Sequence, residues 1–285
     1  MDWFVRLTRA MDYIEENLEE DIDWVAVGRK ATMSAGQFAR MFTLMSGVPL
    51  SEYVRLRRLT KAALDLQQRG DKVLDVALRY GYASPTAFQR AFVQFHGVTP
   101  SLARQPGVRL KAYPRMTFHI SVQGGVALQY RIEEKPAFRA AGYGEWVSML
   151  NGENFTRIPQ MWAELSKERC AQMEQGYADG PYPGMFGVMW MGEDPNKLFY
   201  AIAVSTEKTV AEDGLQIIEI PTQTYAVFET PMASLQDVTR RIYAEWMPAS
   251  GYEHAAGPEM EYYPVADMSD PAKYICEIWV PVVKA

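Results

Sequence analysis

The sequence predicts an all-α N-terminal domain followed by an α+β domain in a chain of 285 residues. A helical motif occurs twice in the first hundred residues, 50 positions apart, whereas short alternating apolar runs typical of strands dominate from about residue 115. Charge changes along with the pattern: residues 24–110 hold 13 Lys/Arg and 4 Asp/Glu, and residues 111–285 hold 14 and 23. A basic block on an otherwise acidic protein indicates a polyanionic partner for the first part.

Each copy of the repeated motif predicts a short helix, a turn and a second, capped helix. A serine suits the N-cap of each second helix, and a glycine suits its C-terminal end. The short preceding helices are expected at 24–30 and 73–80, and residues 50–68 between the copies show the spacing of one long helix. This arrangement is a helix-turn-helix, whose second helix enters the major groove of DNA. The residues that recur at a spacing of 50 include Ser34/Ser84, Phe38/Phe88, Arg40/Arg90, Phe42/Phe92, Gly47/Gly97 and Val48/Val98, and Asp21/Asp71, Arg29/Arg79 and Ser51/Ser101 extend the match.

Residues 3–105 resemble the AraC/XylS family of transcription regulators. The stretch from Val73 to Pro100 carries the strongest resemblance, through Asp75-Val-Ala, Gly81-Tyr, Phe88-x-Arg-x-Phe and Gly97-Val-Thr-Pro. The resemblance implies seven helices, double-stranded promoter DNA and RNA polymerase as partners, and activation more often than repression. It also implies that one chain addresses two major-groove segments about 34 Å apart, so that a monomer suffices on DNA.

The resemblance assigns DNA contact to the outward positions of both second helices. Arg40 and Arg90 suit guanine or a phosphate, with an intramolecular ion pair as the alternative. Some relatives carry a large aromatic residue at the position of Gly36, which leaves base contacts by the first helix open. On the long helix, Arg55, Arg57, Arg58 and Lys61 contact phosphates or are simply solvated. The positions are Ala35, Gly36, Gln37, Ala39, Arg40 and Thr43 on the first helix, and Pro85, Thr86, Ala87, Gln89, Arg90 and Val93 on the second.

The second half predicts two β-α-β-β units that follow a linker. The expected domains are residues 1–106 for DNA binding, 107–125 as linker and leading strand, and 126–285 as an effector domain. Two such units side by side predict an antiparallel sheet with helices on one face and a groove on the other. The expected elements are strands at 128–146, 185–191 and 198–205 around a helix at 158–174, then strands at 215–229, 260–263 and 274–283 around a helix at 235–247.

Residues 126–285 resemble the GyrI-like effector-binding domain of multidrug and stress-response regulators. The matching pieces are Ile158-Pro-Gln-Met-Trp162, Met260-Glu261-Tyr-Tyr263-Pro and Cys276-Glu277-Ile-Trp279-Val-Pro281. The order of the two domains is similar to that of Rob-type regulators. The resemblance implies a small-molecule effector, with Glu277 as the acid of its pocket.

Alternation along the last strand places Glu277 and Trp279 on one face. A buried carboxylate beside an indole needs a partner, which a lipophilic cation supplies through charge attraction and cation–π stacking. The alternative is that the aromatic residues are ordinary core and that Glu277 pairs with an arginine on the next strand. The candidate ligand-binding residues are Glu277, Trp279, Trp162, Tyr263 and Tyr143, with Trp190 and Tyr200 as further wall residues.

The composition argues against several other classes of protein. Two cysteines and three scattered histidines indicate neither a disulfide scaffold nor a zinc site, so no metal or cofactor is expected. No apolar run is long enough to span a membrane and no secretory leader is evident, which favours the cytoplasm and no membrane partner. A ligand-responsive regulator is therefore expected rather than an enzyme. The alternative is a hydrolase that uses Glu277 with Tyr143 or Tyr263.

Overall fold

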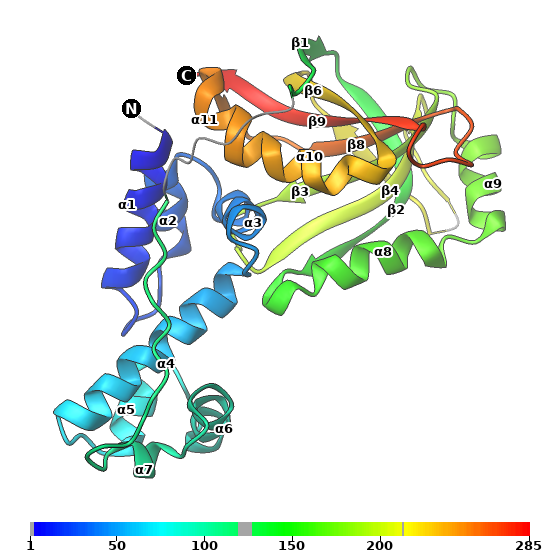
Figure 1. Ribbon diagram of the computed structural model, residues 1–285. Coiled ribbons are helices and arrows are strands. Elements are labelled where there is room, and N and C mark those ends of the chain that lie inside the picture. The colour runs from blue at the N-terminus through cyan, green and yellow to red at the C-terminus, as the bar shows by residue number, and fades with distance from the viewer. Residues whose placement is uncertain (1–2, 119–126, 213) are drawn as a thin grey trace. The chain divides into compact units, whose positions relative to one another are not determined.

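The computed structural model describes residues 3–118, 127–212 and 214–285 (Figure 1). The chain divides into two compact units: Met1–Thr32 with Leu50–Ile120, and Met33–Pro49 with Ser121–Ala285. By its contacts, the segment 33–49 belongs to the second unit, although it lies within the first 106 residues. The boundaries at residues 106 and 126 stay a proposal.

Among its described residues, the first unit contains helices and no strands. The long linking helix and the two short helices of the predicted motifs form at the expected positions, although the second helix of the first motif belongs to the other unit. Residues 107–118 contain no helix or strand, and the rest of the predicted linker and leading strand, 119–125, lies outside the described residues. The helices of this unit are α1 (Trp3–Glu16), α2 (Trp24–Ala31), α4 (Leu50–Gln68), α5 (Val73–Arg79), α6 (Pro85–His96) and α7 (Pro100–Ala103).

Aromatic residues of α6 form the centre of the core in the second half of this unit. Phe88 and Phe92 are fully buried among α4, α5 and α7, with ring centroids 5.4 Å apart. Beside them, Asp65 of α4 accepts hydrogen bonds from Arg79 at 2.7 Å and from the hydroxyl of Tyr80 at 3.0 Å. The inward face of α6 is thus fixed by apolar packing, and residues on its other face are exposed.

Replacing Ser84 by alanine is expected to destabilise the first unit by about 0.5–2 kcal/mol. The Ser84 hydroxyl accepts a hydrogen bond from the Ala87 amide, Pro85 opens the helix, and Gly97 ends it with a φ of 80°. Loss of the cap leaves a first-turn amide without its protein acceptor. Chemical unfolding of the variant, with Ser101→Ala as an exposed-serine control, measures the difference. Equal stability of the two variants would contradict the role of the cap.

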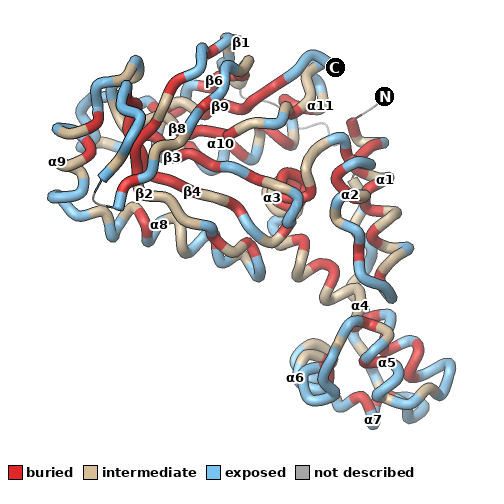
Figure 2. The backbone as a smooth tube through the Cα atoms, turned by 180° about the vertical axis from the view of Figure 1, so that it is seen from behind, coloured by how far each residue is buried: buried red, intermediate tan, exposed pale blue. Residues whose placement is uncertain are grey.

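The second unit is built on an antiparallel sheet. Among the described residues, strand order is β1-β6-β9-β8-β3-β4-β2-β5, and β7 also pairs with β9. Buried residues run along these strands (Figure 2). The strands are β1 (Tyr130–Lys135), β2 (Phe138–Ser148), β3 (Gly184–Met191), β4 (Lys197–Thr206), β5 (Gln216–Ile220), β6 (Gln223–Pro231), β7 (Tyr252–His254), β8 (Glu259–Pro264) and β9 (Ile275–Lys284).

The order of helices and strands in this unit follows the duplicated pattern, but each of the strands predicted at 128–146 and 215–229 is divided into two, β1 with β2 and β5 with β6. One β-α-β-β unit is β2, α8 with α9, β3 and β4; the other is β6, α10 with its continuation, β8 and β9. The predicted helix at 158–174 is broken at Leu165–Ser166 into two helices. The helices are α3 (Ala35–Ser46), α8 (Asn154–Glu164), α9 (Lys167–Gly176), α10 (Leu235–Arg241), a π-helical turn (Ile242–Trp246) and α11 (Met247–Ser250).

The two repeats meet at the centre of the sheet, where β8 pairs with β3. The strand that precedes each repeat is exchanged: β1 pairs with β6 of the second repeat, and β5 pairs with β2 of the first. This exchange ties the two repeats into one sheet. The predicted fold class, an all-α N-terminal part followed by a duplicated α+β domain, is confirmed.

Candidate ligand pocket and DNA-binding helices

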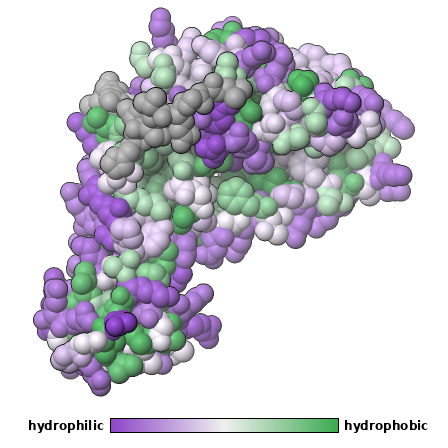
Figure 3. Space-filling model, in the orientation of Figure 1, coloured by the Kyte–Doolittle hydropathy of each residue, from purple (hydrophilic) through white to green (hydrophobic). Residues whose placement is uncertain are grey.

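A cavity of about 520 Å³ lies between α8, α10 and the central strands β3 and β8. The sequence led us to expect a groove on the face without helices, whereas this cavity lies on the helix-covered face, because α8 and α10 stand apart and leave the central strands between them (Figure 1). Hydrophobic residues are visible in the hollow in the middle of this face (Figure 3). Its lining includes Ile158, Trp162, Met185, Met232, Leu235, Gln236, Glu261, Tyr263, Val265 and Met268.

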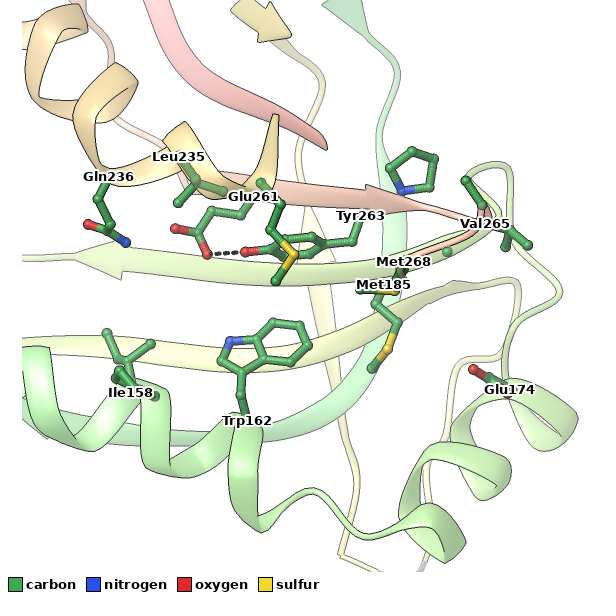
Figure 4. A pocket seen from close by; sticks show the side chains of 15 residues that line it. Ile158, Trp162, Glu174, Met185, Leu235, Gln236, Glu261, Tyr263, Val265 and Met268 are labelled. Carbon is green, nitrogen blue, oxygen red and sulfur yellow. Dashed lines mark hydrogen bonds between the residues drawn. The ribbon is translucent and has the colours of Figure 1, made fainter. Parts of the chain in front are cut away.

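Glu261 is the buried acid of this cavity. It projects from β8 between α10 and the indole of Trp162 (Figure 4). Its carboxylate accepts hydrogen bonds from the hydroxyl groups of Tyr263 at 3.0 Å and Tyr200 at 3.3 Å, and Trp162 Nε1 donates to the Tyr200 oxygen at 2.7 Å. Burial raises the pKa of Glu261 above its ordinary value, despite these hydrogen bonds and the nearby charge of Arg40. The cavity therefore offers a poorly solvated carboxyl group surrounded by apolar surface.

A glycine on the neighbouring strand makes room for this cluster. Gly187 of β3 pairs with Glu261 of β8. A Cβ atom at position 187 would lie 2.4 Å from the Tyr200 hydroxyl and 2.9 Å from Glu261 Oε2. Both distances are shorter than real Cβ contacts, so any side chain at position 187 would separate Glu261 from Tyr200.

The structure brings some of the predicted ligand residues to this cavity but not others. Trp162 and Tyr263 line it, and Tyr200 bonds to its acid. Tyr143 instead lines a smaller cavity of about 190 Å³, where its hydroxyl donates to Gln172. Glu277, Trp279 and Trp190 are absent from the lining of the larger cavity.

Strand register explains the position of Glu277 and Trp279. Glu261 stands opposite Ile278 in the β8–β9 ladder, and Met260 stands opposite Trp279. Paired residues share a face, so Glu277 and Trp279 lie on the face of the sheet opposite to Glu261. The Trp279 side chain is fully buried in the core there, and its Nε1 donates to Glu277 at 2.6 Å.

Glu277 also has an arginine partner, as the alternative interpretation expected. Arg131 of β1 donates a hydrogen bond to Glu277 at 2.7 Å. The alternative expected this arginine on the strand next to β9, but β1 is two strands away, because β6 lies between β1 and β9. Sequence reasoning missed Glu261 as the acid, although alternation in Glu259–Tyr263 could have placed two glutamates and a tyrosine on one face.

The two DNA-binding helices differ in the exposure of their predicted contact residues. On α6, the side chains at 85–87, 89, 90 and 93 are all exposed. On α3, Ala35, Gly36, Gln37 and Ala39 are buried, and Arg40 and Thr43 are partly buried. Arg40 forms an ion pair with Glu259 at 3.3 Å. The DNA contacts of both helices stay a prediction.

Three of the four basic residues singled out on α4 are engaged within the first unit. Arg55 pairs with Glu52 of its own helix, and Arg57 pairs with Glu15 of α1, both at 2.7 Å. Arg58 donates to the carbonyl oxygens of two residues that follow α1. These contacts favour a structural role for the three arginines in the free protein.

Two absences apply to the described parts of the chain. Within them, no group of three or more His, Cys, Asp or Glu side chains is arranged to hold a metal ion. No helix there is both long and apolar enough to cross a membrane.

Each half of the chain matches a known protein family. Residues 128–283 match the GyrI-like small molecule binding domain, and residues 27–105 match a helix-turn-helix domain. The right origin-binding protein of Escherichia coli K12 is 25% identical over 95% of both chains. The Tn10 TetD protein of Escherichia coli is 39% identical over 33% of this chain and 67% of its own length. The multiple antibiotic resistance protein MarA of Escherichia coli K12 is 30% identical over 37% of this chain and 83% of its own.

The matches join an N-terminal helix-turn-helix region to a C-terminal domain whose family is defined by small-molecule binding. This is the order of domains that the sequence predicts, and the cavity at Glu261 lies in the second of them. The chain therefore belongs to the GyrI-like small molecule binding family, as a ligand-responsive transcription regulator with an AraC-type DNA-binding region.

Proposed function

We propose that the protein binds promoter DNA through α3 and α6 and that a lipophilic cation in the Glu261 cavity changes this binding. The observation that carries the ligand assignment is a buried carboxyl group in an apolar cavity of suitable size. RNA polymerase as partner, a cytoplasmic location and a monomer on DNA are parts of the same proposal.

The chemistry of the cavity favours a cation with an apolar body. An isolated carboxylate is costly to bury, and an entering cation supplies the missing counter-charge. The indole of Trp162 and the ring of Tyr263 present aromatic surface beside it, with ring centroids 5.2 Å apart. The methionines of the lining adapt to ligands of irregular shape.

Affinity for the cation should increase with pH. Burial raises the pKa of Glu261 in the free protein, and a bound cation favours its ionised form. Binding therefore releases a proton while pH is near or below that raised pKa, so affinity rises as pH passes through it. Calorimetric titration in two buffers of different ionisation enthalpy measures the proton release. Equal heats in the two buffers together with pH-independent affinity would contradict an acid with a raised pKa in this site.

Replacing Arg90 by alanine is expected to weaken binding of the full-length protein to its selected duplex by about 1–3 kcal/mol. Arg90 is exposed on α6 at a position that the family resemblance assigns to DNA. The duplex is first obtained by selection from random sequences, and affinities are then measured by fluorescence anisotropy. Arg104→Ala removes an equal charge from the exposed surface of the same unit and serves as control.

The pattern of loss across sequences separates two roles for Arg90. Loss confined to the selected duplex indicates contact with a base edge, and equal loss on all duplexes with a smaller salt slope indicates phosphate contact. Failure of the full-length protein to prefer any sequence would contradict DNA-directed regulation.

We also infer that the protein is a regulator and not an enzyme. The hydrolase alternative predicted from the sequence needs Glu277 beside Tyr143 or Tyr263, whereas the acid that contacts Tyr263, at 3.0 Å, is Glu261. Glu277 instead bonds to Arg131 and Trp279 on the opposite face from Tyr263. Incubation of the protein with ligands found by thermal-shift screening, followed by mass spectrometry, is expected to return each ligand unchanged.

A further inference from the structure

The outward face of α3 lies in a polar socket of the GyrI-like domain. The socket consists of the side chains of Tyr243, His254 and Glu259 and the backbone carbonyl groups of Met191, Gly192 and Ala255. The socket and α3 belong to the same compact unit. The α3 residues that contact the socket are Ser34, at the N-cap, Gly36, Gln37 and Arg40.

Gln37 and Arg40 are both engaged by hydrogen bonds in this socket. Gln37 Nε2 lies 2.9 Å from His254 Nδ1 and donates to the Ala255 carbonyl oxygen at 3.3 Å. Arg40 Nε donates to Glu259 Oε2 at 3.3 Å, and only 11% of the Arg40 side chain is exposed. These polar atoms are the ones with which the two side chains would contact DNA.

Glu259 is the centre of the socket's charge. Its Oε1 accepts a hydrogen bond from the Tyr243 hydroxyl at 2.5 Å and lies 3.0 Å from His254 Nε2. Burial alone would raise the pKa of Glu259, but Arg40 and the hydrogen bonds from His254 and Tyr243 outweigh it and bring the pKa to about 2. The Arg40–Glu259 pair is therefore ionised at neutral pH, and each charge depends on the other for compensation.

Gly36 fits the socket because it has no side chain. Its amide donates to the Gly192 carbonyl oxygen at 2.9 Å. A Cβ atom at position 36 would lie 2.8 Å from that oxygen, closer than real Cβ contacts allow. The glycine that left base contacts by α3 open thus has a structural role, the close approach of α3 to the sheet domain.

The second copy of the motif shows that this engagement is specific to α3. Residues 86, 87 and 90 of α6 correspond to Gly36, Gln37 and Arg40, and all three are exposed. Position 86 is a threonine and position 87 an alanine, so two of the four residues by which α3 contacts the socket differ in α6. The socket therefore matches the residues of α3.

We propose that the socket formed by Tyr243, His254 and Glu259 competes with DNA for the contact face of α3. The proposal rests on the assignment of α3 to DNA binding. Gln37 and Arg40 cannot bond to the socket and to base edges at the same time, so full engagement of DNA requires α3 to leave. The free protein then binds DNA with an affinity lowered by the fraction of molecules in which α3 is docked.

The ligand cavity lies next to this socket, so a bound ligand can shift the competition between the socket and DNA. Glu259 and Glu261 are two residues apart on β8 and so share a face. Burial alone would lower the pKa of Arg40, but the charge of Glu259 and, to a smaller extent, that of Glu261 help to raise it above its ordinary value. Where Glu261 is ionised, a cation bound beside it offsets its negative charge, which weakens the hold on Arg40 and favours release of α3.

Hydrogen–deuterium exchange on the full-length wild-type protein tests the release of α3 directly. The probe is a duplex selected from random sequences. When the duplex is saturating, amides in 252–259 and 191–194 are expected to exchange faster because α3 has left, while α3 itself becomes protected by DNA. Unchanged exchange in 252–259 on a fully bound duplex would overturn the proposal.

A substitution that removes one negative charge from the socket gives the second test. Glu259→Gln keeps the shape of the side chain and removes the charge that holds Arg40, so the variant is expected to bind the duplex about tenfold more tightly than wild type. Glu219→Gln, on an exposed side chain of the same domain, makes the same change in net charge and should bind like wild type. Equal affinity of both variants and wild type would overturn the competition.

The two tests separate this proposal from the proposed function. If neither wild type nor Glu259→Gln selects a duplex, DNA binding itself fails. If a duplex is selected but the socket stays protected and Glu259→Gln binds no more tightly, the competition alone fails. Should Glu259→Gln not fold, the exchange experiment on wild type still decides.

Discussion

Replacing Trp279 by alanine is expected to destabilise the sheet domain by about 3–5 kcal/mol, the range for removing a large buried aromatic side chain. Its indole is fully buried, with Tyr182 and Phe186 rings at centroid distances of 5.3 and 5.6 Å. Lys135 Nζ lies 4.4 Å from the ring centroid, and Nε1 donates to Glu277. The substitution therefore removes packing, a cation–π contact and a hydrogen bond together.

Urea unfolding followed by near-ultraviolet circular dichroism measures this loss. Because the chain has two compact units, the transition of the sheet domain must be followed separately from that of the helical unit. Trp146→Ala is the matched control, since 63% of Trp146 is exposed. A Trp279→Ala variant with wild-type stability and lost ligand affinity would restore Trp279 to the binding site that the sequence predicted.

The Glu261→Gln variant is expected to bind benzyltrimethylammonium about 10- to 150-fold more weakly than wild type, which corresponds to about 1.5–3 kcal/mol. Glutamine keeps the size of the side chain and removes the negative charge. Neopentylbenzene, a neutral compound of nearly the same shape, should bind both proteins about equally. The variant should fold, because a buried acid with a raised pKa destabilises the protein as pH rises through that pKa.

Glu277→Gln is the matched control for this experiment. It makes the same chemical change on the opposite face of the sheet, next to Arg131 and outside the cavity. We expect its affinity for both compounds to equal that of wild type in calorimetric titrations. Loss of cation affinity in Glu277→Gln but not in Glu261→Gln would contradict the assignment of the pocket acid.

Local patterns were sufficient to predict most elements of the fold. The bounds of α6 were predicted to within a residue from its serine cap, its C-cap glycine and the spacing of its apolar residues. The strands β3 and β4 also lie where the alternation of apolar residues predicted them. The break between α8 and α9 was missed, because residues 158–174 continue an amphipathic pattern on both sides of Leu165–Ser166. Secondary structure here follows from interactions within a few residues.

The site depended on information that alternation does not contain. The two-residue alternation of a strand shows that Glu277 and Trp279 share a face of the sheet. It does not show whether that face lies toward the helices, because this depends on the pairing of β9 with β8 and on the positions of α8 and α10. A shift of one residue in the β8–β9 register would have placed Glu277 on the pocket face of the sheet and moved its two neighbours to the opposite face. Trp162 and Tyr263 were found because their short motifs matched the family.

The engagement of α3 was also beyond sequence reasoning. Gln37 and His254 are 217 positions apart, and Arg40 and Glu259 are 219 positions apart. The one local signal was Gly36, a residue with no side chain at a position assigned to DNA contact. Its cause became evident only with the backbone of Gly192 beside it.

The affinity of the full-length protein for its selected duplex, with and without saturating benzyltrimethylammonium at constant ionic strength, tests the coupling of ligand and DNA most directly. Coupling between two sites typically changes affinity about 5- to 150-fold. We predict at least about fivefold tighter DNA binding by wild type in the presence of the cation, and no change for Glu261→Gln. The same dissociation constant for wild type with and without the bound cation would contradict regulation through this cavity.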